Sequence, residues 1–462
     1  EAVHPVESEN NDRACIAGRI DAPQKAAKEN IRQIPQVRFS KYAREFVVRV
    51  VPDEFAATGL PLSNDEIYLI QDRPSQRARA NRSDMEVGCD MRVLAFQKRE
   101  SYGAVNHPRN ISTVPTRHTM DLSGYTYSMK KSVLVKLPWY DPCKTPRDMA
   151  AGVMQYVSGR ESVRITDYSR FDGTITQWLR EKVEFAVYRR WVAADDLARL
   201  NSLLLAEVRA PARTRFGVKY DPGWSRLSGS PLTTDGNTLI NGFVDYAAQR
   251  EMGVSPDEAF QQIGPKYGDD GITGDAVTEH VLNRTAQFLG LRLKCETVMA
   301  GQPLTYLARV FVDPWTTPSS IQSPKRALQK IHVTTDAVTD IGVCGYTKTT
   351  AYLTTDGLTP MLSDWCRCYQ RCAGENDLFV DKNVPFWYRD EEARNNSWPQ
   401  QQAGSDVMGI IANELGITVG ELEEHVKLLR SYSGPVCGMP VLKIPQTPVK
   451  LSCSMDGEIY TV

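Results

Sequence analysis

The sequence lacks the features typical of membrane-spanning, disulfide-stapled or disordered proteins. No run of apolar residues approaches the roughly 18 to 20 needed to cross a bilayer, and the first residues show no signal-peptide pattern. The ten cysteines have no paired spacing, which favours free thiols in a reducing cytosol over a disulfide framework. Internal repeats and low-complexity tracts are also absent.

Net charge is nearly absent as well, with 55 Lys and Arg residues against 56 Asp and Glu residues. Composition therefore gives no overall signal for a nucleic-acid partner, although a basic channel can coexist with an acidic site in a neutral protein. With 462 residues and 41% hydrophobic content, the chain can form a large core divided into several lobes. Because it begins at Glu1, we expect it to be a piece of a longer protein, with any membrane anchor outside it.

Two adjacent carboxylates behind a glycine, in Gly268–Asp270, are the most informative local feature. Two further motifs precede them, DYSRFD at Asp167–Asp172 and SGSPLTTDGN at Ser228–Asn237. Taken alone, Gly-Asp-Asp fits a β-turn with two solvated acids equally well. Nucleotidyl transfer through two metal ions, however, needs carboxylates from two chain segments, because the ions lie about 3.5–4 Å apart. Asp167 and Asp269 would supply them.

Together the three motifs resemble motifs A, B and C of the RNA-dependent RNA polymerases of positive-strand RNA viruses. Their wording, DYSRFDGTI at 167–175, SGSP at 228–231 and YGDDG at 267–271, is most similar to nodavirus replicases. The resemblance implies an α+β fold shaped as a right hand, whose palm is an antiparallel sheet packed on helices. It also implies an RNA-directed RNA polymerase that replicates a viral RNA genome by two-metal-ion nucleotidyl transfer from nucleoside triphosphates.

The resemblance further implies a division into fingers, palm and thumb. We expect the fingers at 1–160, the palm at 161–312 with a fingers insertion at about 178–227, and the thumb with a C-terminal segment at 313–462. Within the fingers, residues 1–30 are rich in turn-forming and charged residues, and we expect them to form a surface arm.

Hydrophobic periodicity predicts the elements around the motifs. Apolar and alternating runs predict strands at 47–51, 132–137 and 163–167, the last of which ends at Asp167. Helices are expected at 178–205, 232–250, 276–289 and 420–429, a hairpin at 267–271, a strand at 291–294, and a further hairpin at 304–309 that resembles motif E. Because Gly264–Lys266 precede the Gly-Asp-Asp turn, the strand entering that hairpin must be short or irregular.

Asp167 and Asp269 are the expected metal ligands, with Asp270 as a partial contributor or one that acts through them. Mg²⁺ and Mn²⁺ prefer oxygen ligands, and Mg²⁺ is usually held by one or two carboxylates plus substrate phosphates. A sparse set of acids is therefore what such a site needs. The expected cofactors are two Mg²⁺ or Mn²⁺ ions.

Asp172 is expected to point toward the sugar of the incoming nucleotide. Its carboxylate can accept hydrogen bonds from Asn237, Thr233 or Ser228, in the segment that also contains Gly229, and from a ribose 2′-hydroxyl. The implied product is RNA. The alternative interpretation is an exposed Asp that caps a helix.

Four basic residues are candidates for contacts to the triphosphate. Lys98, Arg99 and Arg109 resemble motif F, and Arg109 is the preferred phosphate contact because guanidinium groups match phosphate oxygens bidentately. Lys294 stands where the motif D lysine is expected, which would protonate the pyrophosphate leaving group. All four also fit ordinary solvated basic residues.

Two other functions stay open. A reverse transcriptase-like polymerase would share the paired acids, although Asp172 with Asn237 argues against it. A catalytically idle RNA-binding or replication-scaffold module would not need intact Asp167, Asp269 and Asp270.

A zinc site also stays open at Cys366, Cys368 and Cys372 with His332. The spacing lacks the two matched pairs of a typical zinc site, and residues 365–372 fit a buried helix equally well.

The resemblance implies an RNA template, nascent RNA and nucleoside triphosphates as partners. It places the protein in the host cytoplasm at membrane-bound viral replication complexes, with membrane association through segments outside this chain, and it allows a homo-oligomer there.

Overall fold

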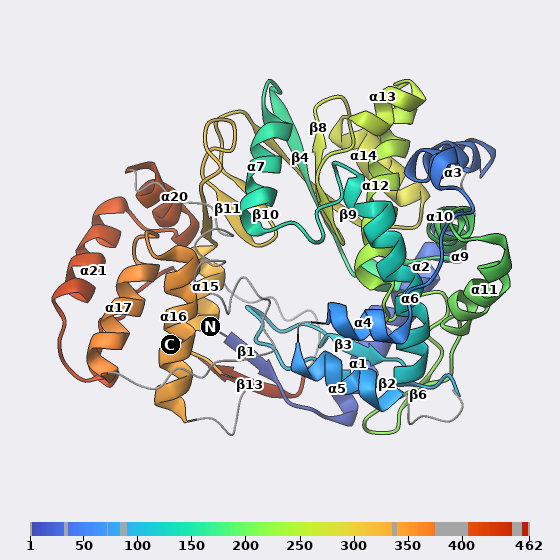
Figure 1. Cartoon of the computed structure of the whole chain (residues 1–462). Helices are drawn as coiled ribbons and strands as arrows, with labels where there is room; N and C mark the ends of the chain where they lie inside the picture. Colours follow the sequence, from blue (N-terminus) through green and yellow to red (C-terminus); the bar gives the residue numbers. More distant parts are fainter. Residues whose placement is uncertain are drawn as a thin grey trace.

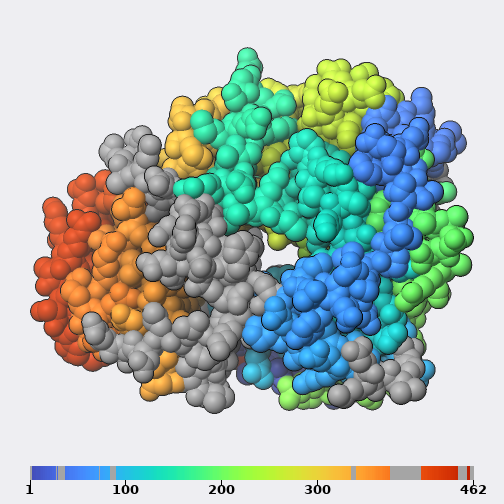
Figure 2. Space-filling model, viewed as in Figure 1, coloured from blue at the N-terminus to red at the C-terminus, as the bar shows by residue number. Residues whose placement is uncertain are grey.

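The structure, a computed structural model, describes residues 2–31, 36–71, 73–83, 90–334, 340–374, 405–445 and 455–460. Helices and small β-sheets are mixed along these ranges, which confirms the α+β class. Figure 1 shows the helices of residues 324–431 grouped at one side of the molecule, and Figure 2 shows a small opening near the middle of the same view. Within the described ranges, no helix is both long and apolar enough to cross a bilayer.

A four-stranded antiparallel sheet carries the motif acids. Its order is β7 (Lys266–Tyr267), β8 (Asp270–Gly274), β4 (Ser162–Tyr168) and β9 (Leu293–Met299). The strand expected to end at Asp167 and the short strand before the Gly-Asp-Asp turn are both confirmed.

The two faces of this sheet enter different cores, as the alternation of side chains along a strand requires. Val163, Ile272 and Val298 pack with α7 (Pro146–Val157) and with the sheet of β10 (Leu304–Tyr306), β11 (Arg309–Phe311) and β12 (Ser320–Gln322). The opposite face enters the largest core through Tyr168 and joins α12 (Thr233–Glu251) and α14 (Glu279–Phe288). The expected helices after the second and third motifs and the hairpin at 304–309 are therefore present.

Two expected strands are wrong. Residues 47–50 belong to α3 (Gln36–Val50), which packs on α12 and buries Phe46 and Val50, spaced by one helical turn. Residues 132–137 close α6 (Thr116–Ser132) and continue as the 3-10 turn η3 (Leu134–Lys136). Short apolar runs fit a buried helix face as well as a strand, so periodicity alone cannot separate them.

The surface arm expected at 1–30 is also wrong. This segment forms β1 (Ala2–Pro5), α1 (Glu9–Ile16), the π-helix η1 (Ala17–Asp21) and α2 (Ala22–Ile31). Val3, Asn11 and Cys15 are each at most 2% exposed, and β1 pairs with β13 (Gly457–Tyr460). Three of its charged residues, Glu7, Asp12 and Arg19, instead bind neighbouring segments.

A second four-stranded sheet lies next to this segment, with the order β3 (Asn110–Thr113), β2 (Val93–Gln97), β5 (Ala212–Thr214) and β6 (Lys219–Tyr220). Between α3 and this sheet in the sequence come η2 (Asp53–Phe55), α4 (Asn64–Ile70) and α5 (Pro74–Ser83), and both α4 and α5 contact α6.

The region expected to be helical at 178–205 is helical but interrupted. It consists of α9 (Gln177–Leu179), the π-helix η4 (Arg180–Glu184), α10 (Phe185–Trp191), η5 (Ala194–Asp196) and α11 (Leu197–Ala206). Two short helices flank the motifs, α8 (Phe171–Thr174) and α13 (Pro256–Gln261). The C-terminal helices are α15 (Pro324–Ile331), α16 (Ile341–Asp356), α17 (Leu362–Ala373), α20 (Ser405–Leu415), α21 (Val419–Ser431) and η6 (Val436–Gly438).

A buried ion pair fixes the β7–β8 hairpin to α12. The Lys266 ammonium lies 2.8 Å from Asp245 Oδ2, and both side chains are only 1% exposed. Lys266 also donates to the Ile272 carbonyl, while Thr273 Oγ1 and the Gly264 amide donate to the Asp245 carboxylate. These bonds satisfy both buried charges, so removal of either partner would leave the other uncompensated.

We therefore expect Asp245→Ala to lower the free energy of unfolding by about 3–5 kcal/mol, because Lys266 would stay buried without its partner. Urea denaturation would measure the loss. Glu9→Ala is the control, since its pair with Arg13 is more than half exposed and is worth under about 1 kcal/mol. A loss no larger than that of the control would contradict this role of the pair.

Candidate active site

The motif acids meet at one end of the four-stranded sheet. Asp167 is the penultimate residue of β4, and Asp269 occupies the β7–β8 turn. Thr166 pairs with Gly271, so the register continued by one residue sets Asp167 beside Asp270. Gly268 has a φ of 59°, a left-handed conformation that glycine adopts at little cost.

The acids are close enough to oppose one another's ionisation. Burial raises the pKa of Asp269 to about 6, with further contributions from Asp172 and Asp167. Burial raises the pKa of Asp270 to about 7, with further contributions from Asp269 and Asp167. Clustered carboxylates shift each other's pKa upward in this way, and a bound cation would offset the repulsion.

This donor set fits Mg²⁺ or Mn²⁺ in chemistry and in sparseness. The oxygen ligands would come from two chain segments, Asp167 on β4 and Asp269 with Asp270 on the β7–β8 hairpin, and substrate phosphates usually complete such a site. In the described residues, no group of three or more His, Cys, Asp or Glu side chains has already converged on a metal-binding point. The remaining ligands would therefore have to come from substrate and water.

Helix α12 holds the acidic turn from behind. Asn241 Nδ2 donates to the carbonyls of Gly268 and Asp270, each at 3.1 Å. Thr238 Oγ1 accepts from the Gly268 amide at 2.9 Å, and the Tyr168 hydroxyl donates to Asn241 Oδ1 at 3.3 Å. Sequence reasoning missed Asn241 and Thr238, although their spacing of three residues on a predicted helix places them on one face.

The hydrogen bond expected between Asn237 and Asp172 is present. Asn237 Nδ2 donates to Asp172 Oδ1 at 2.8 Å, while Arg226 Nε donates to Asn237 Oδ1 at 3.0 Å. Arg226 in turn forms a two-pronged ion pair with Glu184, and neither side chain is exposed. This fixed amide orientation leaves the second oxygen of Asp172 available to accept another hydrogen bond.

Ser228 and Thr233 are not directed at Asp172. Ser228 Oγ accepts from the Ser112 amide at 2.9 Å and donates to the Asn110 carbonyl. Thr233 Oγ1 donates to backbone carbonyls of the loop that precedes α12. Of the three expected partners, only Asn237 reaches the carboxylate, while Ser228 and Thr233 fix the loop to β3 and to itself.

The three cations expected from motif F pair with two different carboxylates, Glu100 and Glu7. Burial raises the pKa of Asp269, and Arg109 is close enough to offset part of that rise. The Arg109 guanidinium also lies 3.5 Å from Glu100. Lys98 pairs with Glu100 at 2.9 Å, and Arg99 pairs with Glu7 of the N-terminal segment at 3.2 Å. Arg109 is therefore the best placed of the three for a phosphate.

Lys294 lies directly opposite Asp167 in the β4–β9 ladder and is exposed. Opposed residues of an antiparallel pair project from the same face, with Cβ atoms about 4.5–5.5 Å apart. The structure therefore brings Lys294 beside a motif acid.

Sequence reasoning also missed Arg326 on α15. Burial raises the pKa of Asp270, and the positive charge of Arg326 offsets part of that rise. This helix from the C-terminal region therefore contributes positive potential at the acids. A single Arg among several basic residues gives no signal of this kind before the fold is known.

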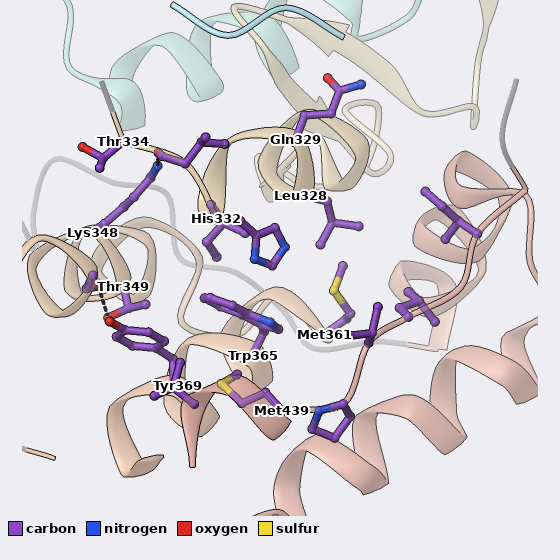
Figure 3. Close-up of a pocket in the computed structure, with 18 of the residues that line it drawn as sticks. Leu328, Gln329, His332, Thr334, Lys348, Thr349, Met361, Trp365, Tyr369 and Met439 are labelled. Carbon is purple, nitrogen blue, oxygen red and sulfur yellow. Dashed lines mark hydrogen bonds between the residues drawn. The ribbon is translucent and has the colours of Figure 1, made fainter. Parts of the chain in front are cut away.

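A separate cavity of about 700 Å³ lies among the C-terminal helices. Figure 3 shows Trp365, Tyr369, Met361 and Met439 around it, and none of the motif acids lines it. His332 packs edge-on against Trp365, with ring centroids 5.0 Å apart.

The zinc alternative is not supported. Cys366 packs in one apolar cluster of α17, while Cys368 lies in another with Cys372 at its margin. No metal-binding group that includes them occurs in the described residues. The buried helix proposed as the other interpretation of this segment is present as α17.

Gly229 yields a prediction about the loop before α12. A Cβ there would lie 2.4 Å from the Ser112 carbonyl oxygen, so we expect Gly229→Ala to destabilise the fold by about 1–3 kcal/mol. Gly152→Ala in α7 is the control, because no atom of another segment lies within 4 Å of the position that a Cβ would take there, and it should be neutral or stabilising by up to about 1 kcal/mol. Equal unfolding midpoints for the two variants would contradict this account.

Comparisons with known proteins agree with the motifs. No family model matches the chain. The chain is 46% identical to the RNA-directed RNA polymerase of greasy grouper nervous necrosis virus, over 99% of this chain and 46% of that protein. The polymerase of Pariacoto virus is 30% identical over 99% of this chain and 46% of that protein. The polymerase of Nodamura virus is 34% identical over 81% of this chain and 37% of that protein.

The chain thus spans less than half the length of these relatives. Among solved structures, the RNA-dependent RNA polymerase of a human picobirnavirus aligns with a TM-score of 0.53 and 14% identity, over 87% of this chain and 81% of that chain. That likeness shows a shared fold. The resemblance to nodavirus polymerases indicated by the three motifs is confirmed across almost the entire chain.

Proposed function

We propose that this chain is the polymerase region of a viral replicase and copies an RNA template into RNA from nucleoside triphosphates. The observation that carries the proposal is the meeting of Asp167 with Asp269 and Asp270 at one sheet end, beside the Asp172–Asn237 pair. An idle RNA-binding scaffold has no need for this costly cluster of acids. A reverse transcriptase has no need for a polar pair at the sugar.

In the proposed mechanism, the carboxylates of Asp167 and Asp269 would hold the divalent ions, with Asp270 beside them. Two Mg²⁺ or Mn²⁺ ions bound there would activate the 3′-hydroxyl of the nascent strand and neutralise the triphosphate. Arg109 binds the β- and γ-phosphates through its guanidinium fork, with Lys98 and Arg99 as weaker candidates.

Lys294 is the proposed proton donor to the departing pyrophosphate. Its position opposite Asp167 supports a location at the site, and its ammonium would also balance the acids between turnovers. Ser228, Gly229 and Thr233 act by shaping the loop that carries the nucleotide-binding helix α12.

The sugar is selected by Asp172 with Asn237. A ribose 2′-hydroxyl can donate to the free oxygen of Asp172, which Asn237 and Arg226 hold in a fixed orientation. A deoxynucleotide leaves that oxygen without a partner in a partly dehydrated site, which disfavours its incorporation.

We assign the fingers to residues 1–160, the palm to 161–312 with the insertion at about 178–227, and the thumb with the C-terminal segment to 313–462. The acid-bearing sheet with α12 and α14 would be the palm. Template and nascent RNA are the proposed partners, in a cytoplasmic replication complex attached to membrane through other segments.

Asp269→Asn should abolish RNA synthesis and leave the fold intact, because it removes a ligand from a turn without disturbing core packing. Incorporation of labelled nucleotide on a defined RNA template would measure activity, and thermal unfolding would check the fold. Asp275→Asn is the matched control, since Asp275 follows the same hairpin but pairs with Arg160 at the sheet's opposite end. Activity above a few per cent of wild type in Mg²⁺ would remove Asp269 from the mechanism.

Asp172→Ala should narrow the preference for NTPs over dNTPs by on the order of tenfold, as for the loss of one hydrogen bond to the sugar. Asn237→Ala should act in the same direction because it releases the carboxylate. Ser228→Ala should slow both substrates without changing their ratio, since its hydroxyl faces β3. Competition kinetics would measure the ratios, and an unchanged ratio in Asp172→Ala would mean that Asp172 only supports the fold.

A further inference from the structure

The loop that carries the motif F cations, residues 97–109, is held by the N-terminal segment. Val3 exchanges two backbone hydrogen bonds with Tyr102, at 2.8 and 2.9 Å. The Tyr102 hydroxyl accepts from the Arg109 amide at 2.9 Å. Val3 therefore helps to position the Arg109 backbone through Tyr102.

The beginning of this loop is held by the same segment. Gln97 Nε2 donates to the Ser8 carbonyl and to Asp12 Oδ1, at 2.9 and 2.7 Å. Gln97 and Asp12 are at most 4% exposed. Glu7 forms ion pairs with Arg99 and Arg215 at the surface.

The end of the loop is held further along the segment. Arg19 donates two hydrogen bonds to the His107 carbonyl, at 2.8 and 2.6 Å. Gly18 packs so closely on the His107 ring that a Cβ would lie 2.5 Å from it, and its carbonyl accepts from Arg170. Gly18 therefore contacts both the loop, through His107, and the segment between Asp167 and Asp172, through Arg170.

Asp456, near the far end of the sequence, in turn holds the N-terminal segment, and its contacts with Ser8 and Asn11 are called the latch below. Asp456 Oδ2 accepts from Ser8 Oγ at 2.7 Å. The Asp456 backbone carbonyl accepts from Asn11 Nδ2 at 2.7 Å and from the Val6 amide, while its amide donates to Asn11 Oδ1 at 3.0 Å. Asn11 is 1% exposed, so all of its polar atoms depend on these protein partners.

We propose that Asn11 and Asp456 are positioning residues for nucleotide binding. By fixing residues 3–12 against β13, they hold loop 97–109 so that Arg109 meets the triphosphate. This inference rests on the proposed function of Arg109. It makes nucleotide affinity depend on side chains that touch neither substrate nor the motif acids.

Asn11→Ala should raise the KM for nucleoside triphosphates by roughly five- to tenfold and change kcat by less than about twofold, because ground-state binding is loosened while the acids stay in place. Asp456→Ala should raise KM in the same direction, and Asp456→Asn should restore it, since an amide oxygen can accept from Ser8. Arg430→Ala, which breaks a pair with Asp364 between α21 and α17, is the control and should leave KM unchanged. An unchanged KM in both latch variants would overturn the proposal.

A double-mutant cycle separates positioning from general loss of stability. In an Arg109→Ala background, Asn11→Ala should raise KM no further, because both changes act through the same guanidinium. Additive effects would overturn the proposal. If Arg109→Ala itself leaves KM unchanged, the proposed role of Arg109 fails, and the latch loses its link to the nucleotide.

Hydrogen exchange gives a readout that does not need activity. The amides of Lys98, Tyr102 and Arg109 are hydrogen-bonded within this assembly, so they should exchange at least about tenfold faster in Asn11→Ala and Asp456→Ala than in wild type. Unchanged exchange in a folded Asn11→Ala protein would overturn the latch, whether or not the chain proves to be a polymerase.

Discussion

The candidate site depends on the hydrogen bonds between α12 and the Gly268–Asp269 turn. Burial, and after it the charges of neighbouring carboxylates, raises the pKa values of Asp269 and Asp270, so the ionised acids are costly to hold together in this partly dehydrated place. Asn241 holds the two carbonyls that flank Asp269, and the buried Lys266–Asp245 pair fixes the hairpin from below. These fully paired buried groups fix the position of the turn, which keeps the acids placed for a cation.

A second part of α12 fixes Asp172, the proposed contact to the sugar. Asp172 is oriented by Asn237, which is oriented by Arg226, whose charge is balanced by Glu184. A Cβ on Gly236 would lie 2.4 Å from the Glu184 carboxylate, so a larger residue there would displace the ion pair. A buried pair of this kind contributes more to a unique geometry than to stability. One helix therefore both bonds to the turn that contains Asp269 and carries the amide that orients Asp172.

Sequence reasoning located the acids and the Asp172–Asn237 pair because reaction chemistry restricts residue type and spacing there. It failed where three-dimensional contacts decide. The apolar run at 47–51 fits a strand by propensity, but burial of Phe46 against α12 makes it helical. The polar residues that predicted a solvated arm at 1–30 bind loop 97–109 and Asp456, partners that are remote in sequence. Glu184 and Arg226 gave no signal, because a buried ion pair cannot be distinguished from solvated charges before the fold is known.

Asp167 and Asp269 are the proposed joint ligands of divalent cations at the acidic turn. A crystal structure of the chain with template RNA, a nascent strand, a non-hydrolysable nucleoside triphosphate and Mn²⁺ would test this assignment through anomalous scattering. The account predicts two Mn²⁺ peaks about 3.5–4 Å apart, with oxygen ligands from Asp167 and Asp269. Bound nucleotide with Mn²⁺ peaks that lack either carboxylate as a ligand would contradict it.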